Sequence, residues 1–146
     1  DMDYGELAAN MKLIAIDEMR HAEDFADRIK ELDGEPVVDP LEKAQKGQPV
    51  EKIFPFDANL EDHTIEVYNE LLLICRDNGD STSMKLFETI IDQEQAHLTY
   101  FEDVDEHIKR MGDTYLARIA GTPSSTGLAP QGFVIRQQGG GGGGGA

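Results

Sequence analysis

The motif Glu-x-x-His occurs twice in this chain, as Glu18-Met19-Arg20-His21 and as Glu94-Gln95-Ala96-His97. Both copies lie in segments that we expect to be helical, and residues three positions apart lie on the same face of a helix. Each copy can therefore direct a carboxylate and an imidazole towards one point. A single copy is most often a solvated surface contact. Two copies use half of the chain's four histidines, and on packed helices they are typical of carboxylate-bridged di-iron bundles.

Apolar residues recur at helical spacing in three long segments and one short one. Gly34 and Pro36 follow the first segment in the order that commonly ends a helix. Residues 33–56 contain four prolines and no sustained period, so we expect an extended connection there. Asp57 suits the N-cap of the helix that follows. The predicted helices cover residues 4–32, 57–78, 82–110 and 113–120.

The lengths of the connections predict the topology. The short link Gly79-Asp80-Ser81 makes the second and third helices antiparallel, whereas the long connection before them can run the length of a bundle and leave the first two helices parallel. We therefore predict an all-α, ferritin-like bundle with a long crossover over residues 1–121. Residues 122–146 form a C-terminal tail, and we expect its final glycine run not to be native sequence.

Ionisable residues interrupt the predicted apolar stripes at Glu18 with His21, at Glu61, and at Glu94 with His97. A charged group in a core is costly unless it is paired or binds a metal. Oxygen and imidazole ligands suit iron or manganese. We predict that Glu18 and Glu94 bridge two ions, that His21 completes one, and that Glu61 with His97 completes the other. Two alternatives remain open: internal Glu–His salt bridges, and a Glu61 that is present only to complement its helix dipole.

The composition restricts the partners and the compartment. The chain has 13 basic and 29 acidic residues, a net charge of −16, which disfavours nucleic acid and anionic membranes. Its single cysteine, Cys75, excludes a disulfide framework and a four-cysteine iron centre, and we expect it to be a buried core thiol. No apolar run is long enough for a membrane span and no signal peptide is present, so we expect a cytoplasmic location.

The segment Ile16-Asp17-Glu18-Met19-Arg20-His21-Ala22-Glu23, the position of Glu61, and Glu94-Gln95-Ala96-His97 resemble bacterioferritin. The resemblance covers roughly residues 1–121, and the ending from Gly112 to Gly127 most resembles bacterioferritins of sulfate-reducing bacteria. It implies an iron-storage shell of twenty-four subunits. Such a shell oxidises Fe(II) with dioxygen or peroxide at a di-iron ferroxidase centre and stores ferric mineral. It also implies a possible electron-donor protein for iron release.

The resemblance gives Met19 a role that the spacing alone does not. In the family, this methionine from each of two subunits binds the iron of a shared porphyrin, either haem b or a related group such as iron coproporphyrin III. Met19 lies about 100° round the helix from Glu18, on a flank with Ala8, Ala15 and Ala26. The alternative is a methionine that fills a contact between subunits.

The family also has a helix before the one that carries Glu18, and that helix supplies a sixth ligand, a glutamate. This chain lacks it. We expect a preceding segment of about two dozen residues in the whole protein. Its absence here should leave an exposed apolar groove along Leu7, Met11 and Ile14.

Two other functions compete with iron storage. A di-iron peroxidase of rubrerythrin type would normally carry a four-cysteine iron domain, which a single cysteine excludes. A non-catalytic helical scaffold would use the Glu–His pairs only as structural contacts. Stoichiometric binding of iron separates the scaffold from the storage protein.

Overall fold

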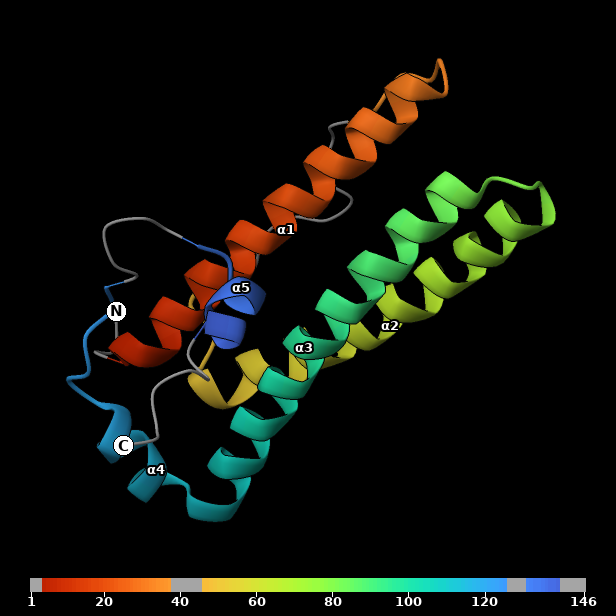
Figure 1. Ribbon diagram of the computed structural model, residues 1–146. Helices are drawn as coiled ribbons and strands as arrows, with labels where there is room; N and C mark the ends of the chain where they lie inside the picture. The colour runs from red at the N-terminus through yellow and green to blue at the C-terminus, as the bar shows by residue number, and fades with distance from the viewer. Residues whose placement is uncertain (1–3, 38–45, 126–130, 140–146) are drawn as a thin grey trace, which may run out of the picture. The chain divides into compact units, whose positions relative to one another are not determined.

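The computed structural model describes residues 4–37, 46–125 and 131–139. Within these residues the regular secondary structure is all helical, apart from an isolated bridge between Tyr4 and Thr122. The predicted all-α class is therefore confirmed. Contacts divide the chain into two compact units, residues 1–20 with 103–146 and residues 21–102. The helices in Figure 1 are α1 (Gly5–Glu31), α2 (Val50–Asp77), α3 (Ser81–Met111), α4 (Asp113–Ile119) and α5 (Phe133–Gly139).

The unit of residues 21–102 contains the second half of α1, all of α2 and most of α3. Residues 78–80 join α2 to α3, and the two helices run antiparallel, whereas α1 and α2 run in the same direction (Figure 1). Both predicted directions are confirmed. Successive residues of α1 meet successively earlier residues of α3: His21 meets Gln93, Phe25 meets Phe87 and Arg28 meets Ser83.

Three aromatic rings, one from each helix, form the centre of this unit. The ring of Phe25 lies 5.3 Å from that of Tyr68 and 5.1 Å from that of Phe87, and the last two are 5.7 Å apart. Aromatic pairs at such distances stabilise a core beyond the area that they bury. These contacts join the three helices about one turn after His21 along α1.

The start of α2 differs from the prediction. The helix begins at Val50, with Pro49 at its N-cap and Pro55 inside it, so the predicted start at Asp57 is wrong. Pro55 lies beyond the first turn, so it removes the hydrogen bond to the carbonyl four residues before it and weakens the helix. Phe54 is only 2% exposed, and its ring packs against Tyr100 and Phe101 of α3. We attribute the longer helix to this packing, which offsets the cost of Pro55. The connection before α2 includes residues 38–45, which lie outside the described part.

In the other unit, the start of α1 is held by the segment after α4. The amide of Glu6 donates to Thr122 Oγ1 at 2.8 Å, which satisfies one of the free N–H groups at the start of a helix. Gly5 is required for this approach, since a Cβ at this position would overlap the carbonyl oxygen of Thr122. The predicted short helix after Gly112 is confirmed as α4.

The C-terminal tail contains a helix that the sequence did not predict. Residues Phe133–Gly139 form α5, and Phe133 is 3% exposed. The buried carboxylate of Asp17 on α1 accepts a hydrogen bond from the amide of Val134 at 3.1 Å. The glycine run expected to be non-native lies almost entirely in residues 140–146, outside the described residues.

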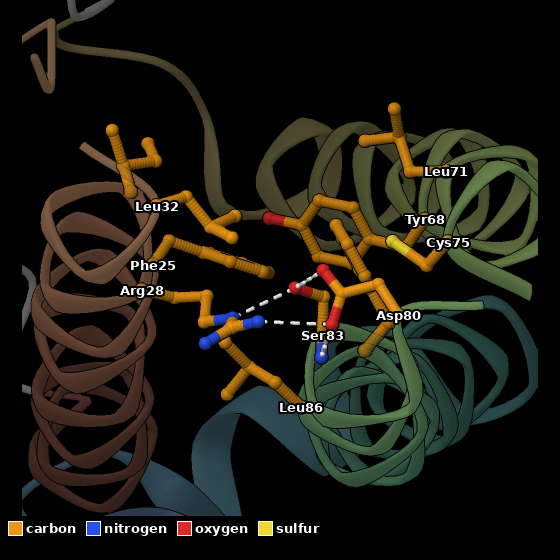
Figure 2. Close-up of a pocket in the computed structure, with 11 residues that line it drawn as sticks. Phe25, Arg28, Leu32, Tyr68, Leu71, Cys75, Asp80, Ser83 and Leu86 are labelled. Carbon is orange, nitrogen blue, oxygen red and sulfur yellow. Dashed lines mark hydrogen bonds and ion pairs between the residues drawn. The ribbon is translucent and has the colours of Figure 1, made fainter. Parts of the chain in front are cut away.

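The exposed groove expected along Leu7, Met11 and Ile14 is not found. Leu7 and Ile14 are buried and Met11 is half-buried. An apolar cavity of about 360 Å³ lies instead in the unit of residues 21–102, between the ends of α1 and α2 and the start of α3 (Figure 2). Its lining includes Leu32, Tyr68, Leu71 and Cys75.

Cys75 is half-buried at this cavity rather than inside the core as expected. Desolvation is the main reason that the pKa of its thiol is raised. A raised pKa keeps the thiol protonated and unreactive at neutral pH.

In the described part of the chain, no helix is long and apolar enough to cross a membrane.

Candidate metal centre

Glu94 lies between the two motif histidines. Its Oε1 is 3.2 Å from Nδ1 of His21 on α1, and its Oε2 is 3.2 Å from Nδ1 of His97, one turn further along α3. The two imidazole rings lie 6.0 Å apart. Glu94 and His97 are completely buried, and His21 is 3% exposed. Each oxygen of one carboxylate therefore faces a different imidazole, which is the arrangement of a carboxylate that can bridge two ions.

Glu61 comes to the same place from α2. It is 9% exposed, and its Oε1 lies 3.9 Å from Nδ1 of His97. Since α2 begins at Val50, Glu61 lies about three full turns into the helix and not in its first turn. The helix-dipole explanation applies to the first turn, so it does not account for this residue.

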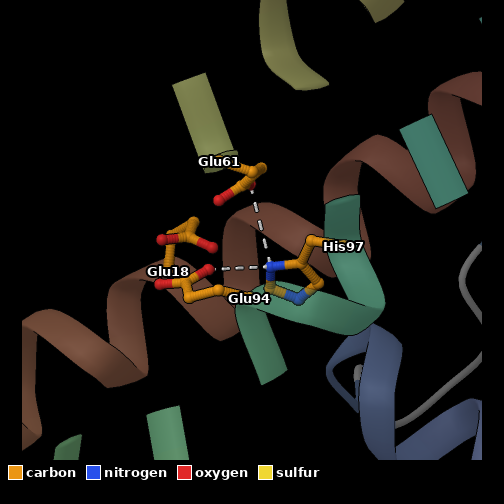
Figure 3. Close-up of side chains that lie close together, drawn as sticks. All are labelled: Glu18, Glu61, Glu94 and His97. Atoms are coloured by element: carbon orange, nitrogen blue, oxygen red, sulfur yellow. Dashed lines mark hydrogen bonds and ion pairs between the residues drawn. The ribbon is translucent and has the colours of Figure 1, made fainter. Parts of the chain in front are cut away.

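Glu18 precedes His21 by one turn on the continuous helix α1. In the unit of residues 21–102, Glu61, Glu94 and His97 each offer a ligand atom, and these atoms lie within 4.8 Å of one another (Figure 3). His21 lies beside this group, at the other oxygen of Glu94. The structure thus brings His21, Glu61, Glu94 and His97 together within one unit, and Glu18, one turn before His21 on α1, stays a predicted ligand. Oxygen and imidazole donors in this number suit iron or manganese.

The charge of Glu94 depends on its two histidine neighbours. Burial acts to raise the pKa of this carboxyl, but the hydrogen bonds with His21 and His97 outweigh it and lower the pKa to about 2. Glu94 is therefore ionised at neutral pH. Glu61 brings a second carboxylate to His97, and two carboxylates so close together repel one another unless positive charge lies among them. A pair of divalent cations would supply that charge.

Gln93 also belongs to this site, although the sequence analysis did not select it. Its side-chain oxygen lies 2.9 Å from Nε2 of His21. The sequence holds no signal for it beyond its place next to Glu94, since its contact with His21 depends on how α1 packs against α3.

Met19 lies apart from the cluster. Its side chain is 60% exposed, as expected for a residue about 100° round the helix from Glu18. The role of Met19 stays a prediction.

Comparison with known proteins shows the class to which this fold and cluster belong. The family model described as "Ferritin-like domain" matches residues 1–111. The bacterioferritin of Desulfovibrio desulfuricans is 63% identical over 134 residues, which are 92% of this chain and 75% of that protein. The bacterioferritin of Mycobacterium avium is 34% identical over 84% of this chain and 77% of that protein.

Solved structures agree with the sequence comparison. An X-ray structure of the Desulfovibrio desulfuricans bacterioferritin, described by its diiron site in different catalytic states, superposes with a TM-score of 0.86 and 63% identity. The superposition covers 91% of this chain and 78% of the Desulfovibrio desulfuricans chain. The BfrA bacterioferritin of Mycobacterium tuberculosis has a TM-score of 0.75 at 33% identity, over 81% of this chain and 75% of that one. The chain belongs to the bacterioferritin family of iron-storage proteins.

Proposed function

We propose that this chain oxidises ferrous iron at a di-iron centre and stores the ferric product. The observation that carries the proposal is Glu94, whose two carboxylate oxygens each lie 3.2 Å from the Nδ1 of a different buried histidine. Glu18 and Glu94 would bridge two ions, His21 would complete one, and Glu61 with His97 the other. The relative of known structure with 63% identity is described by a diiron site, which supports this assignment.

The reaction needs two ferrous ions as substrate. Each gives up one electron, and the pair reduces dioxygen to hydrogen peroxide with two protons, or hydrogen peroxide to two molecules of water with two protons. The chain's own residues hold the two ions side by side and exclude bulk water, because Glu94, His97 and His21 are buried. Carboxylates also favour the more highly charged ferric product, since their attraction grows with the charge of the ion. The ferric product then leaves for the mineral store.

The proposal extends to assembly and to a porphyrin. We infer a cytoplasmic shell of twenty-four copies, in which Met19 from each of two subunits binds the iron of one haem b or iron coproporphyrin III. The 60% exposure of Met19 and the family relationship support this role. A porphyrin in that position would serve as an entry point for electrons from a donor protein that releases the stored iron.

Anaerobic titration with Fe(II), followed by exposure to oxygen, tests the proposal. The unaltered protein should bind two ions per chain and oxidise them rapidly, with mineral accumulating beyond that ratio. The double variant Glu94→Ala with His97→Ala should lose rapid oxidation. A matched control exists in His63 and Glu66, which also lie three positions apart on a helix, with Nδ1 and Oε2 3.7 Å apart, but are more than 70% exposed.

The control variant His63→Ala with Glu66→Ala should oxidise iron at the unaltered rate. Circular dichroism should show that both double variants keep their helices. Unchanged initial rates in the Glu94 and His97 variant would remove the di-iron assignment. If the unaltered protein does not bind iron stoichiometrically, the proposal is wrong and the non-catalytic scaffold is favoured.

A further inference from the structure

Two consecutive residues of α3 contact the imidazole of His21 at its two nitrogens. Gln93 Oε1 lies 2.9 Å from Nε2, and Glu94 Oε1 lies 3.2 Å from Nδ1. The ring is 3% exposed, and all three residues belong to the same compact unit. Hence the groups in these two contacts both come from α3.

The two contacts have different chemical consequences. A neutral imidazole carries its proton on one nitrogen and keeps a lone pair on the other, and a metal binds at the lone pair. Nδ1 of His21 faces the carboxylate cluster, so the form that binds an ion carries its proton on Nε2. That N–H would donate to the oxygen of Gln93. An acceptor at this place selects the tautomer and fixes the ring plane, as such outer partners do in metal sites generally.

Gln93 has a further property because its side chain is an amide. A carboxylate can only accept a hydrogen bond, whereas an amide has both an accepting oxygen and a donating NH₂ group. If the proton lies on Nδ1 instead, the bare Nε2 can accept from the rotated amide of Gln93. With an ion, Nε2–H donates to the amide oxygen. The same residue satisfies the buried ring in both states.

We propose that Gln93 is a positioning residue for metal binding at His21. It holds the ring in the ion-binding orientation and tautomer, and it retains the ring in the same place when the ion leaves. This inference rests on the proposed di-iron function and deepens it, because a storage centre must be loaded and emptied repeatedly.

Titration of the full-length, metal-free protein with Co(II) tests the inference through binding and not through activity. The d–d absorption of bound Co(II) reports each binding step. Gln93→Leu removes the hydrogen bond at similar volume, and it should weaken one of the two steps about tenfold to a hundredfold, the usual effect of losing an outer partner of a ligating histidine. Gln93→Glu keeps an acceptor at Nε2 and should restore most of the lost affinity.

Gln95→Leu is the matched control, since Gln95 lies on the same helix but is exposed. It should bind Co(II) as the unaltered protein does. The inference is overturned if Gln93→Leu leaves both steps unchanged, if Gln95→Leu weakens binding equally, or if Gln93→Glu fails to rescue a weakened step. If the unaltered protein binds fewer than two Co(II) ions per chain, the proposed di-iron function itself fails, so the two failures are distinguishable.

Discussion

Glu94 shows how one buried residue can define the chemistry of a helical bundle. Burial alone would raise its pKa and favour the neutral acid. The hydrogen bonds with His21 and His97 reverse that effect and hold the pKa near 2. A carboxylate that stays ionised, completely buried and in contact with two imidazoles has little value as a packing residue. Its position is explained by cations that it would hold between the two histidines.

The exposed side chain of Met19 leads to a prediction about porphyrin binding. In the shell that we propose, two Met19 side chains bind one porphyrin iron through their sulfur atoms. Met19→Leu keeps the apolar bulk but removes the sulfur, so the particle should assemble normally and contain no porphyrin. Absorption spectra and the ratio of porphyrin to protein would measure this. Ile74→Leu is the control, because Ile74 on α2 is a similarly sized side chain that is also exposed. Normal porphyrin content in the Met19 variant would show that Met19 does not bind the porphyrin iron and only fills a contact between subunits.

At the scale of single elements, α2 depends on the packing of Phe54. This side chain is 2% exposed and lies against two rings of α3, while Pro55 weakens the helix beside it. Phe54→Ala should therefore lower the free energy of unfolding by about 3–5 kcal/mol, the usual cost of removing a buried phenylalanine. Chemical denaturation would measure the change. Phe56→Ala is the control, because Phe56 is 50% exposed and its loss should cost much less.

The sequence allowed most of the architecture and the two Glu-x-x-His pairs to be predicted, because both have local signals. Glu61 has no such partner on its own helix, so the sequence left its helix-dipole alternative open. Helical periodicity located the long helices, and the spacing of Glu18 and His21 within one turn needs no tertiary information. The start of α2 was missed because Pro55 is a local signal against a helix, and the opposing contacts of Phe54 lie more than forty residues away in sequence. Gln93 was missed because an amide beside a ligand has no spacing rule of its own.

Helix α5 depends on a close approach to α1 at Gly132. A Cβ at this position would overlap the carboxylate of Asp17, which accepts the amide hydrogen of Val134. Gly132→Ala should therefore separate α5 from α1 and expose Phe133. Hydrogen exchange of residues 133–139 should become faster, while exchange in α2 stays unchanged. Gly139→Ala is the control, since a Cβ there meets nothing within 4 Å. Equal protection in the two variants would show that α5 is not held through this contact.

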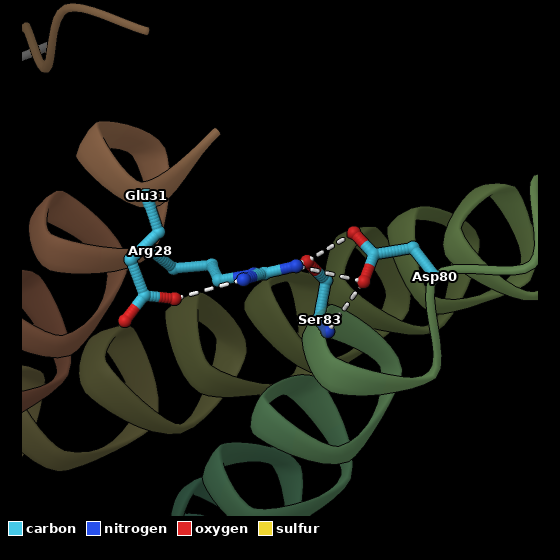
Figure 4. A network of polar contacts seen from close by, with 4 residues as sticks. All are labelled: Arg28, Glu31, Asp80 and Ser83. Carbon is cyan, nitrogen blue, oxygen red and sulfur yellow. Dashed lines mark hydrogen bonds and ion pairs between the residues drawn. The ribbon is translucent and has the colours of Figure 1, made fainter. Parts of the chain in front are cut away.

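At the scale of the whole molecule, the net charge of −16 makes the response to acid a balance of two effects. Protonation of surface carboxylates relieves repulsion, but it also removes the ion pairs that join helices. Arg28 on α1 carries one such connection, as Figure 4 shows. Its Nε donates to Ser83 Oγ at 2.8 Å, and its terminal nitrogens contact Asp80 at 2.9 Å and Glu31 at 2.8 Å. This network joins the end of α1 to the turn before α3.

Asp80 should make this connection sensitive to pH. Its pKa is lowered, first by the hydrogen bonds from the Ser83 hydroxyl and amide and then by Arg28. A carboxyl with a folded-state pKa below its unfolded value of 3.8 contributes stability at neutral pH that is lost as the pH falls through the folded-state pKa. Asp80→Asn should therefore lower the melting temperature at pH 7, and the difference from the unaltered protein should shrink below about pH 4.

Asp77→Asn provides the matched control for this prediction, because it removes the same charge from the last residue of α2, three positions before Asp80. Asp77 is 65% exposed and pairs with the neighbouring Arg76, and exposed pairs of this kind contribute little. Its variant should melt close to the unaltered protein at every pH. Thermal unfolding of the three proteins between pH 2.5 and 7, a range chosen to span the ordinary aspartate pKa, would measure the difference. If the Asp80 variant loses as much stability at the acid limit as at neutral pH, the ionised carboxylate of Asp80 is not what joins α1 to α3.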